Sequence, residues 1–486
     1  MKTVNHAILA MLVTSALVAP AMAQDGGAKN VILMITDGTG IESFRAASYY
    51  RHGALGHEPY DAFDVQVFSA THPLNTSNEP TMSDEGAVSF DPAELFNDAA
   101  SGEGGGFEGK LMNYPGYFAG YDYARQEATD SAAAATALAS GQKSFNNAIN
   151  WSNNDEPLKH VGEYVVESGR ALGVVSSVMI SHATPAGFLA HNVSRNDYAA
   201  IGAEIIDSEL ATVVMGTGHP HYDANGNRVE TPTENDYRYV GSQDHFERVA
   251  AGQTSWQMIE TRDDFEALAR GEMQIEGERV LGLAQNMQTL QFNRDGVGAG
   301  NLLETSPSLS TMTRAALNVL GTHEEGFFLM VEGGAVDWAA HANNLPRLVE
   351  EQVDFNESVE AVVGWVEANS SWDETMIVVT TDHGNGLLQG PNSDEIAYQP
   401  ITNQGAGAMP LVRWHSDNHT RELVPLYAQG AGAEYFREVA QSAEGLAIYG
   451  VDAASQVWVD NTDVFRATMA AMGIEEADMA QQAAAQ

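Results

Sequence analysis

Short apolar runs rich in β-branched residues alternate with helical patterns along this chain, and this alternation restricts its possible folds most. The runs have the length of buried strands. Strands that alternate with helices predict an α/β protein with a mostly parallel sheet covered by helices on both faces. The expected strands are residues 30–36, 172–180, 327–331, 376–381 and 423–428. The expected helices are residues 131–139, 158–168, 196–209, 311–320 and 346–368.

Two polar segments interrupt the alternation. Residues 75–109 are rich in Ser, Glu, Asp and Gly, a composition that predicts an exposed loop. Residues 218–277 are polar and broken by turn residues, which predicts short peripheral elements. Neither segment has the character of an interdomain linker. We therefore expect residues 24–486 to form one domain with insertions near 75–109 and 218–277.

Residues 1–23 have the features of a cleaved secretory signal. A lysine at position 2 precedes an apolar stretch at 7–20, and Ala21-Met22-Ala23 forms a small-x-small cleavage site. The stretch is too short to span a bilayer. We expect a periplasmic or secreted protein that is not inserted in the membrane. Because the chain has no cysteine, its stability outside the cell would depend on packing and bound metals rather than disulfides.

The charge balance is strongly acidic. The 66 acidic and 23 basic residues give a formal net charge of −43, which argues against nucleic acid and anionic membranes as partners. An anionic substrate would also be repelled unless bound divalent metal supplied local positive charge. Because salt screens a carboxylate-rich, lysine-poor surface, we interpret the excess as adaptation to high salt in preference to a cationic partner.

Ionisable residues cluster after the expected strands, with His419 instead just before the strand at 423–428, and they are candidate metal ligands. The carboxyl ends of parallel strands meet at one edge of a sheet, so these side chains should converge. Crowded carboxylates repel one another unless cations bind between them. Mixed His and Asp ligands suit zinc, whereas an oxygen-only set suits magnesium. The candidates are Asp37, Glu332, Asp337, His341, Asp382, His383 and His419.

Asp130 and Ser131 begin an alanine-rich helical stretch. The first turn of a helix offers unpaired N–H groups and a positive dipole end, so a serine there could attack a phosphate that the backbone helps to hold. Taken alone, the pair is more typical of a simple helix cap. The metal-ligand candidates elsewhere in the chain reverse that preference and make Ser131 the candidate nucleophile.

These motifs, in this order, resemble the alkaline phosphatase family over most of the expected mature length. The resemblance implies a three-layer sandwich, in which helices flank a large mostly parallel central sheet and insertions lie at the periphery, and it usually implies a homodimer. It also suggests a bacterial, secreted member of marine or halophilic type. The matching segments are residues 37–40, 129–133, 183–186, 191–195, 332–337 with His341, 381–384 and 419–420.

The resemblance assigns a role to each matching residue. Ser131 would become a phosphoserine, Arg195 would grip the phosphate, and Asp130 would orient Arg195. Two zinc ions and one magnesium ion per subunit are implied. The first zinc would be held by Asp337, His341 and His419, the second by Asp37, Asp382, His383 and Ser131, and the magnesium by Asp37, Thr184 and Glu332.

Two positions depart from the best-known bacterial pattern. His182 stands where some members carry aspartate, and Trp338 stands where some carry a basic residue or histidine. We expect His182 beside the magnesium rather than bound to it, which would weaken that site. Without a basic residue at 338, product phosphate should be held less tightly. Other members have both residues, so we interpret them as a subgroup feature.

Alternative functions remain open at this point. Relatives with similar metal sites cleave phosphodiesters or sulfate esters, and an exported protein that only binds phosphate or metal is a third possibility. Arg195 favours a dianionic monoester, because its planar donors can bind two oxygens at once. No motif identifies the alcohol, and the resemblance implies hydrolysis of a broad range of small phosphomonoesters.

Overall fold

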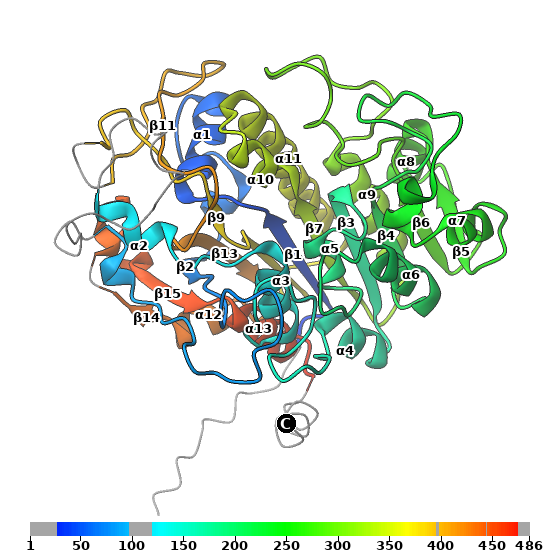
Figure 1. The fold of residues 1–486 in the computed structure, drawn as a ribbon, viewed down its shortest axis with the longest axis horizontal. Helices are drawn as coiled ribbons and strands as arrows, with labels where there is room; N and C mark the ends of the chain where they lie inside the picture. The colour runs from blue at the N-terminus through cyan, green and yellow to red at the C-terminus, as the bar shows by residue number, and fades with distance from the viewer. Residues whose placement is uncertain (1–26, 97–118, 395–397, 444, 475–486) are drawn as a thin grey trace, which may run out of the picture.

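The structure is a computed structural model that describes residues 27–96, 119–394, 398–443 and 445–474. The expected signal at 1–23 and residues 97–109 of the first expected insertion lie outside the described residues. Helices cover both faces of a large central sheet (Figure 1). The predicted α/β class with a mostly parallel sheet is therefore confirmed.

The central sheet has eleven strands among the described residues, in the order β14-β15-β2-β13-β8-β1-β7-β3-β4-β6-β5. Neighbouring strands from β8 to β5 are parallel, whereas β13 runs antiparallel to both β8 and β2. The strands are β1 Asn30–Thr36, β2 Val65–Ala70, β3 Ala171–Met179, β4 Val213–Thr217, β5 Trp256–Ile259, β6 Arg279–Leu283, β7 Phe327–Gly333, β8 Thr375–Thr380, β13 Val424–Gly430, β14 Gln441–Ser442 and β15 Val457–Asp460. Two small pairs lie outside this sheet: β9 Gly384–Asn385 with β12 His419–Thr420, and β10 Leu388–Gln389 with β11 Arg413–Trp414.

The helices form two layers because alternate residues of each buried strand face opposite sides. In β1, Val31, Leu33 and Ile35 join one core with α3, α4, α6 and α13, while Ile32 and Met34 join a second core with α1, α8, α9 and α11. The helices are α1 Ile41–His52, α2 Asp122–Arg125, α3 Ser131–Ser140, α4 Val161–Glu167, α5 Ala183–Ala186, α6 Tyr198–Ser208, α7 Gln243–Ala250, α8 Arg262–Ala269, α9 Leu309–Leu320, α10 Ala335–His341, α11 Leu345–Asn369, α12 Tyr435–Val439 and α13 Thr462–Ala471. Over the described ranges, no helix combines the length and apolar character needed to cross a membrane.

All ten expected elements are present, with ends shifted by a few residues: the strands are β1, β3, β7, β8 and β13, and the helices are α3, α4, α6, α9 and α11. Sequence analysis missed the strands β2, β4, β5, β6, β14 and β15 of the central sheet. It also treated 218–277 as wholly peripheral, whereas β5 from that segment pairs with β6 and extends the central sheet. Trp256 and Ile259 at its two ends are buried, which explains why this strand joins the core.

The strand register brings the polar strand ends together. Thr36 of β1 is level with Gly333 of β7, and Ile35 is level with Thr380 of β8. Asp37, Glu332 and Asp382 therefore meet at the carboxyl ends of three adjacent strands. We call this the carboxyl edge of the sheet.

Candidate active site

Ser131 is the first residue of α3 and is buried at the carboxyl edge. Asp130 caps the helix, because its Oδ1 accepts from the backbone N–H groups of Ala133 and Asn147, both at 3.0 Å. Its Oδ2 accepts from Arg195 at 3.0 Å. One carboxylate thus fixes both the start of the helix and the guanidinium beside the serine.

The electrostatics of this corner keep Asp130 and Arg195 charged. Burial alone would raise the pKa of Asp130, but the charge of Arg195 and the backbone N–H groups hold it below its usual value. His182 lies 3.4 Å from Arg195. Burial and the neighbouring guanidinium lower the pKa of His182 to about 3, so its imidazole is neutral and its Nε2 faces the guanidinium as an acceptor.

A first group of candidate metal ligands joins α10 to β12. Ligand atoms of Asp337, His383 and His419 lie within 4.8 Å of one another, and His341 Nε2 is 3.1 Å from His419 Nε2 and 3.5 Å from Asp337 Oδ2. The Nδ1 atoms of His341 and His419 lie 2.7 and 2.8 Å from backbone carbonyls. Donation to these carbonyls places the proton on Nδ1 and leaves both Nε2 lone pairs available, the arrangement typical of metal-bound histidine.

A second group surrounds the serine. His383 Nε2 lies 3.1 Å from Asp382 Oδ2, 3.5 Å from Asp37 Oδ1 and 3.2 Å from Ser131 Oγ. Asp37 also belongs to a third group with His182 and Glu332, whose ligand atoms lie within 4.8 Å of one another. Thr184, at the start of α5, interacts through its side chain with Glu332. Asp37 is therefore shared by two groups, and His182 is within ligand distance of the third.

Close packing at this edge depends on a glycine. Gly38 has a φ of +68°, and a Cβ at this position would lie 2.4 Å from Asp337 Oδ1. Only glycine combines that backbone conformation with the close approach of a carboxylate. Asp337 is held from the other side by Asn385, whose Nδ2 donates to Oδ1 at 2.6 Å.

The carboxylates of these groups are not satisfied by the described chain. Both oxygens of Asp37, Oδ2 of Asp382 and Oε1 of Glu332 are buried and accept no hydrogen bond from the described residues. Burial and neighbouring carboxylates raise the pKa of Asp37 well above its usual value, and burial raises that of Glu332 to about 8 and that of Asp382 to about 6. Buried carboxylates in this state are stabilised by cations, so these residues fit divalent metals.

The serine and the arginine open into a pocket of about 590 Å³. Sequence analysis identified most of its lining but missed Phe292, Ala342 and Asn418, which belong to no motif. The Trp338 ring lies between those of His182 and Phe292, with centroid distances of 5.9 and 6.3 Å. The lining residues are Ser131, His182, Arg195, Phe292, Asp337, Trp338, His341, Ala342, Asn418 and His419.

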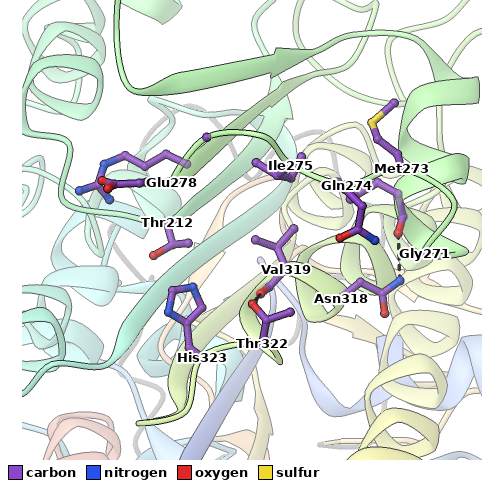
Figure 2. A pocket seen from close by; sticks show the side chains of 13 residues that line it. Thr212, Gly271, Met273, Gln274, Ile275, Glu278, Asn318, Val319, Thr322 and His323 are labelled. Carbon is purple, nitrogen blue, oxygen red and sulfur yellow. Dashed lines mark hydrogen bonds between the residues drawn. The ribbon is translucent and has the colours of Figure 1, made fainter.

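A cavity of about 670 Å³ lies at the opposite edge of the sheet, and Figure 2 shows its lining. Thr212 precedes β4, Arg279 begins β6, and His323 precedes β7. These are the amino ends of parallel strands, whereas ligands of such sheets bind at the carboxyl ends. The smaller pocket beside Ser131 is therefore the candidate active site.

A fourth group, His160, Glu163 and His191, also brings ligand atoms within 4.8 Å of one another, but its protons argue against a metal. Gly162 N–H donates to His160 Nδ1, which places the proton on Nε2. His191 faces acceptors on both sides, with Nδ1 at 3.1 Å from Glu204 Oε1 and Nε2 at 3.1 Å from the Leu158 carbonyl. Neither ring has a lone pair free to bind a metal. His191 is instead an imidazolium that forms ion pairs with Glu163 and Glu204.

The charge on His191 should make the free energy of unfolding depend on pH. Burial opposes its charge, but hydrogen bonds to Glu163 and Glu204 raise the pKa of His191 to about 9. A raised pKa stabilises the fold below the unfolded value of about 6.5, and the contribution disappears as pH rises through 9. We expect His191→Gln to lower the free energy of unfolding in urea by about 2 kcal/mol near pH 6 and by much less near pH 10. A cost that is the same at both pH values would contradict this.

The carboxyl edge of this parallel sheet carries a serine at the start of a helix, an arginine and three carboxylate–histidine groups. This combination of fold and site defines a metal-dependent hydrolase. The family model described as alkaline phosphatase matches residues 110–404, more than half of the 486 residues. The chain therefore belongs to the alkaline phosphatase family, and it is a phosphomonoesterase of this metal-dependent family.

Relatives match over most of their length. The chain is 26% identical over 472 residues to alkaline phosphatase 4 of Bacillus subtilis (strain 168), an alignment that covers 84% of this chain and 85% of the relative. It is 27% identical over 479 residues to alkaline phosphatase H of Pseudomonas aeruginosa (strain UCBPP-PA14), with 92% and 86% covered.

Solved structures confirm the fold. Thermus thermophilus alkaline phosphatase aligns with a TM-score of 0.61 at 20% identity, covering 95% of this chain and 96% of that one. The enzyme of the Antarctic bacterium TAB5 aligns with a TM-score of 0.59 at 20% identity, covering 92% and 98%. A variant of the TAB5 enzyme was solved with magnesium in its M3 site.

Proposed function

We propose that the chain hydrolyses a broad range of phosphate monoesters through a phosphoserine intermediate on Ser131. The observation that carries this proposal is the position of Ser131 Oγ, 3.2 Å from His383 Nε2 at the N-terminus of α3. Arg195 and three unsatisfied carboxylates surround it. A helix N-terminus and a guanidinium attract the dianion, and the carboxylates provide sites for cations.

The proposed metal content is two zinc ions and one magnesium ion per subunit. Asp337, His341 and His419 would hold the first zinc, and Asp37, Asp382 and His383 would hold the second beside Ser131. Asp37, Glu332 and Thr184 would hold the magnesium, with His182 beside the ion rather than bound to it. When bound, these cations supply the positive charge that favours the ionised serine and the oxygens of the phosphoryl group.

The chain's own residues perform the remaining work. Arg195 binds two phosphoryl oxygens through its planar donors, and Asp130 keeps that guanidinium in place. Ser131 Oγ loses its proton and bonds to phosphorus as the bond to the alcohol oxygen breaks, and the alcohol leaves with a proton. Water then displaces Ser131 from phosphorus, which returns the proton to the serine and releases phosphate. Two in-line displacements give net retention of configuration.

The competing reaction is cleavage of phosphodiesters or sulfate esters, which carry less charge than a monoester dianion. Arg195 and the cation sites favour the dianion, so kcat/KM should be far higher for p-nitrophenyl phosphate than for bis-p-nitrophenyl phosphate or p-nitrophenyl sulfate. The three compounds share one leaving group, so differences in kcat/KM arise from the transferred group and not from the phenol that leaves. A preference for the diester or the sulfate would refute the monoester assignment.

Trp338 should make the release of product easy. It occupies the pocket beside Arg195 without adding positive charge. We expect Trp338→Lys to tighten inhibition by inorganic phosphate about tenfold, the effect of roughly 1.4 kcal/mol from one added cation. Trp338→Gln is the control, because it removes the ring without adding charge. Equal phosphate inhibition in the two variants would contradict the charge argument.

The acidic excess of the chain supports a proposed adaptation to high salt. Carboxylates that repel one another in dilute buffer are screened by salt. We therefore expect the thermal unfolding midpoint to rise steeply as sodium chloride approaches molar concentration. Sucrose at matched osmolality is the control, because it does not screen charge. A midpoint that does not respond to salt would leave the excess without this explanation.

The remaining expectations also belong to this proposal. Residues 1–23 would be removed as a signal, residues 24–486 would form one domain, and the enzyme would act as a homodimer in the periplasm or outside the cell. The apolar stretch at 7–20 supports export, and the net charge of −43 argues against nucleic acids as partners.

A further inference from the structure

A second cavity, away from the catalytic pocket, combines apolar walls with several carboxylate and hydroxyl groups. It has a volume of about 290 Å³ and lies between α11 and the loop that leads into α9. Glu351 and Asp354 of α11, Ser306 of the loop and Tyr50 are among its walls. No histidine or lysine of the described chain lines it, and Arg262, which does, pairs with Glu266 at 2.7 Å.

Three of these lining residues carry a buried oxygen without a hydrogen-bond partner in the described chain: Glu351 Oε1, Asp354 Oδ1 and Ser306 Oγ. Glu351 is only 4% exposed and Ser306 only 3%. An enclosed oxygen that accepts nothing destabilises the fold. Three of them around one cavity indicate a ligand that they share.

The carboxylates of the cavity differ in their ion pairing. Glu350 is paired with Arg294 at 2.6 Å and Arg347 at 3.3 Å, whereas no basic group of the described residues pairs with Glu351 or Asp354. Asp354 Oδ2 accepts the backbone N–H of Leu309 at the start of α9, and the backbone N–H of Ser310 also stabilises this carboxylate, whereas Oδ1 has no partner among the described residues. Burial, followed by the charges of Asp354 and Glu350, raises the pKa of Glu351 to about 8. Unpaired oxygens and crowded charge are the same two properties that mark the carboxylates beside Ser131.

We propose that this cavity binds one divalent cation of the oxygen-seeking kind, calcium or magnesium. The carboxylates of Glu351 and Asp354 and the hydroxyl of Ser306 would be its protein ligands. The volume leaves room for water to complete the coordination shell, as these cations commonly require. Zinc is disfavoured because it prefers the nitrogen and sulfur ligands that this lining lacks.

The cation would fasten the loop before α9 to α11. Ser306 lies in the loop and both carboxylates lie on the helix, so binding closes a contact between the two segments. The same loop also reaches the catalytic pocket, because the backbone N–H of Phe292 interacts with Glu351 while Phe292 lines the pocket beside Trp338. This second site therefore stabilises one wall of the active site without contacting the substrate.

Calcium binding tests the proposal directly. Zinc-loaded enzyme is dialysed to equilibrium against radioactive calcium at high ionic strength, which suppresses weak binding to the acidic surface. Wild type should bind one more calcium ion per subunit than Glu351→Gln or Asp354→Asn. Glu367→Gln is the matched control, because it removes the same charge from an exposed position on the same helix. Equal calcium stoichiometry in wild type and Glu351→Gln would overturn the proposal.

Two further measurements complete the test. Far-UV circular dichroism checks that the variants are folded, and Ser306→Ala keeps both carboxylates, so it should bind calcium about tenfold more weakly with the stoichiometry of wild type. Unchanged affinity in Ser306→Ala would remove the hydroxyl from the ligand set and overturn the site as described. Competition with magnesium then identifies the cation: displacement of the extra calcium ion supports magnesium, and its retention supports calcium.

Discussion

Ser131→Ala should lower kcat for phosphomonoesters by about 10⁴-fold or more, the scale found when a covalent nucleophile is removed from an enzyme. The hydroxyl lies at the N-terminus of α3, 3.2 Å from His383 Nε2, and no other hydroxyl among the lining residues of the pocket takes its place. Asp130 rather than Ser131 caps the helix, so the substitution should leave the fold intact. Steady-state kinetics with p-nitrophenyl phosphate measures the loss.

Two controls distinguish loss of the nucleophile from loss of the fold: the metal content of the variant, and the substitution of a second serine in the same helix. Ser131→Ala should retain the zinc and magnesium of the wild type in elemental analysis, because the carboxylates and histidines of the three groups remain. Ser140→Ala removes a buried hydroxyl at the other end of the same helix, where it donates to Thr136. This control should keep its turnover. Substantial turnover by Ser131→Ala would refute the phosphoserine route.

The central part of the fold could be predicted because its strands are buried on both faces. Such strands form continuous apolar runs, and β1, β3, β7 and β8 are buried at every position. The polar residue that follows each run is then conspicuous. The convergence of Asp37, Glu332 and Asp382 follows from parallel pairing alone, without knowledge of the loops.

The edge of the sheet could not be predicted in the same way. β5 is four residues long and lies within the polar segment 218–277, and β6 is five residues long and begins just after it. Short strands near an edge have a weak local signal, and only their pairing in the folded chain makes them strands. The same limit applies to β13, whose antiparallel direction depends on the path of the chain from β12.

Several features of the site also depend on contacts between distant segments. Phe292 reaches the pocket from a loop, and Asn385 holds Asp337 across 48 positions in the sequence. Neither side chain belongs to a charged cluster or a periodic pattern. The cavity beside Glu351 is another case, because a single acidic stripe on α11 is typical of a solvated helix face. Only the enclosed oxygens distinguish it from one.

Removal of metal should have the second large effect. Extended treatment with a chelator, followed by its removal, should abolish at least about 99% of the turnover and lower the thermal unfolding midpoint. Asp37, Asp382 and Glu332 are buried together, and both oxygens of Asp37 and one oxygen each of Asp382 and Glu332 have no partner among the described residues. Without a cation, desolvation and mutual repulsion destabilise these carboxylates. A ligand at 1,000 times its Kd stabilises a fold by about 4 kcal/mol, and three sites offer several such contributions.

Asp37 belongs to two groups of candidate metal ligands, one with Asp382 and His383 and one with His182 and Glu332. Asp37→Asn should bind fewer metal ions, and its midpoint should move less than that of wild type on chelation, because much of the carboxylate repulsion is already gone. Asp373→Asn is the control for charge, since it changes an exposed carboxylate before β8. Added zinc and magnesium should restore turnover to the chelated wild type, which separates loss of metal from unfolding. A metal-free protein that still hydrolyses phosphomonoesters would show that the carboxylates around Ser131 serve the fold rather than the reaction.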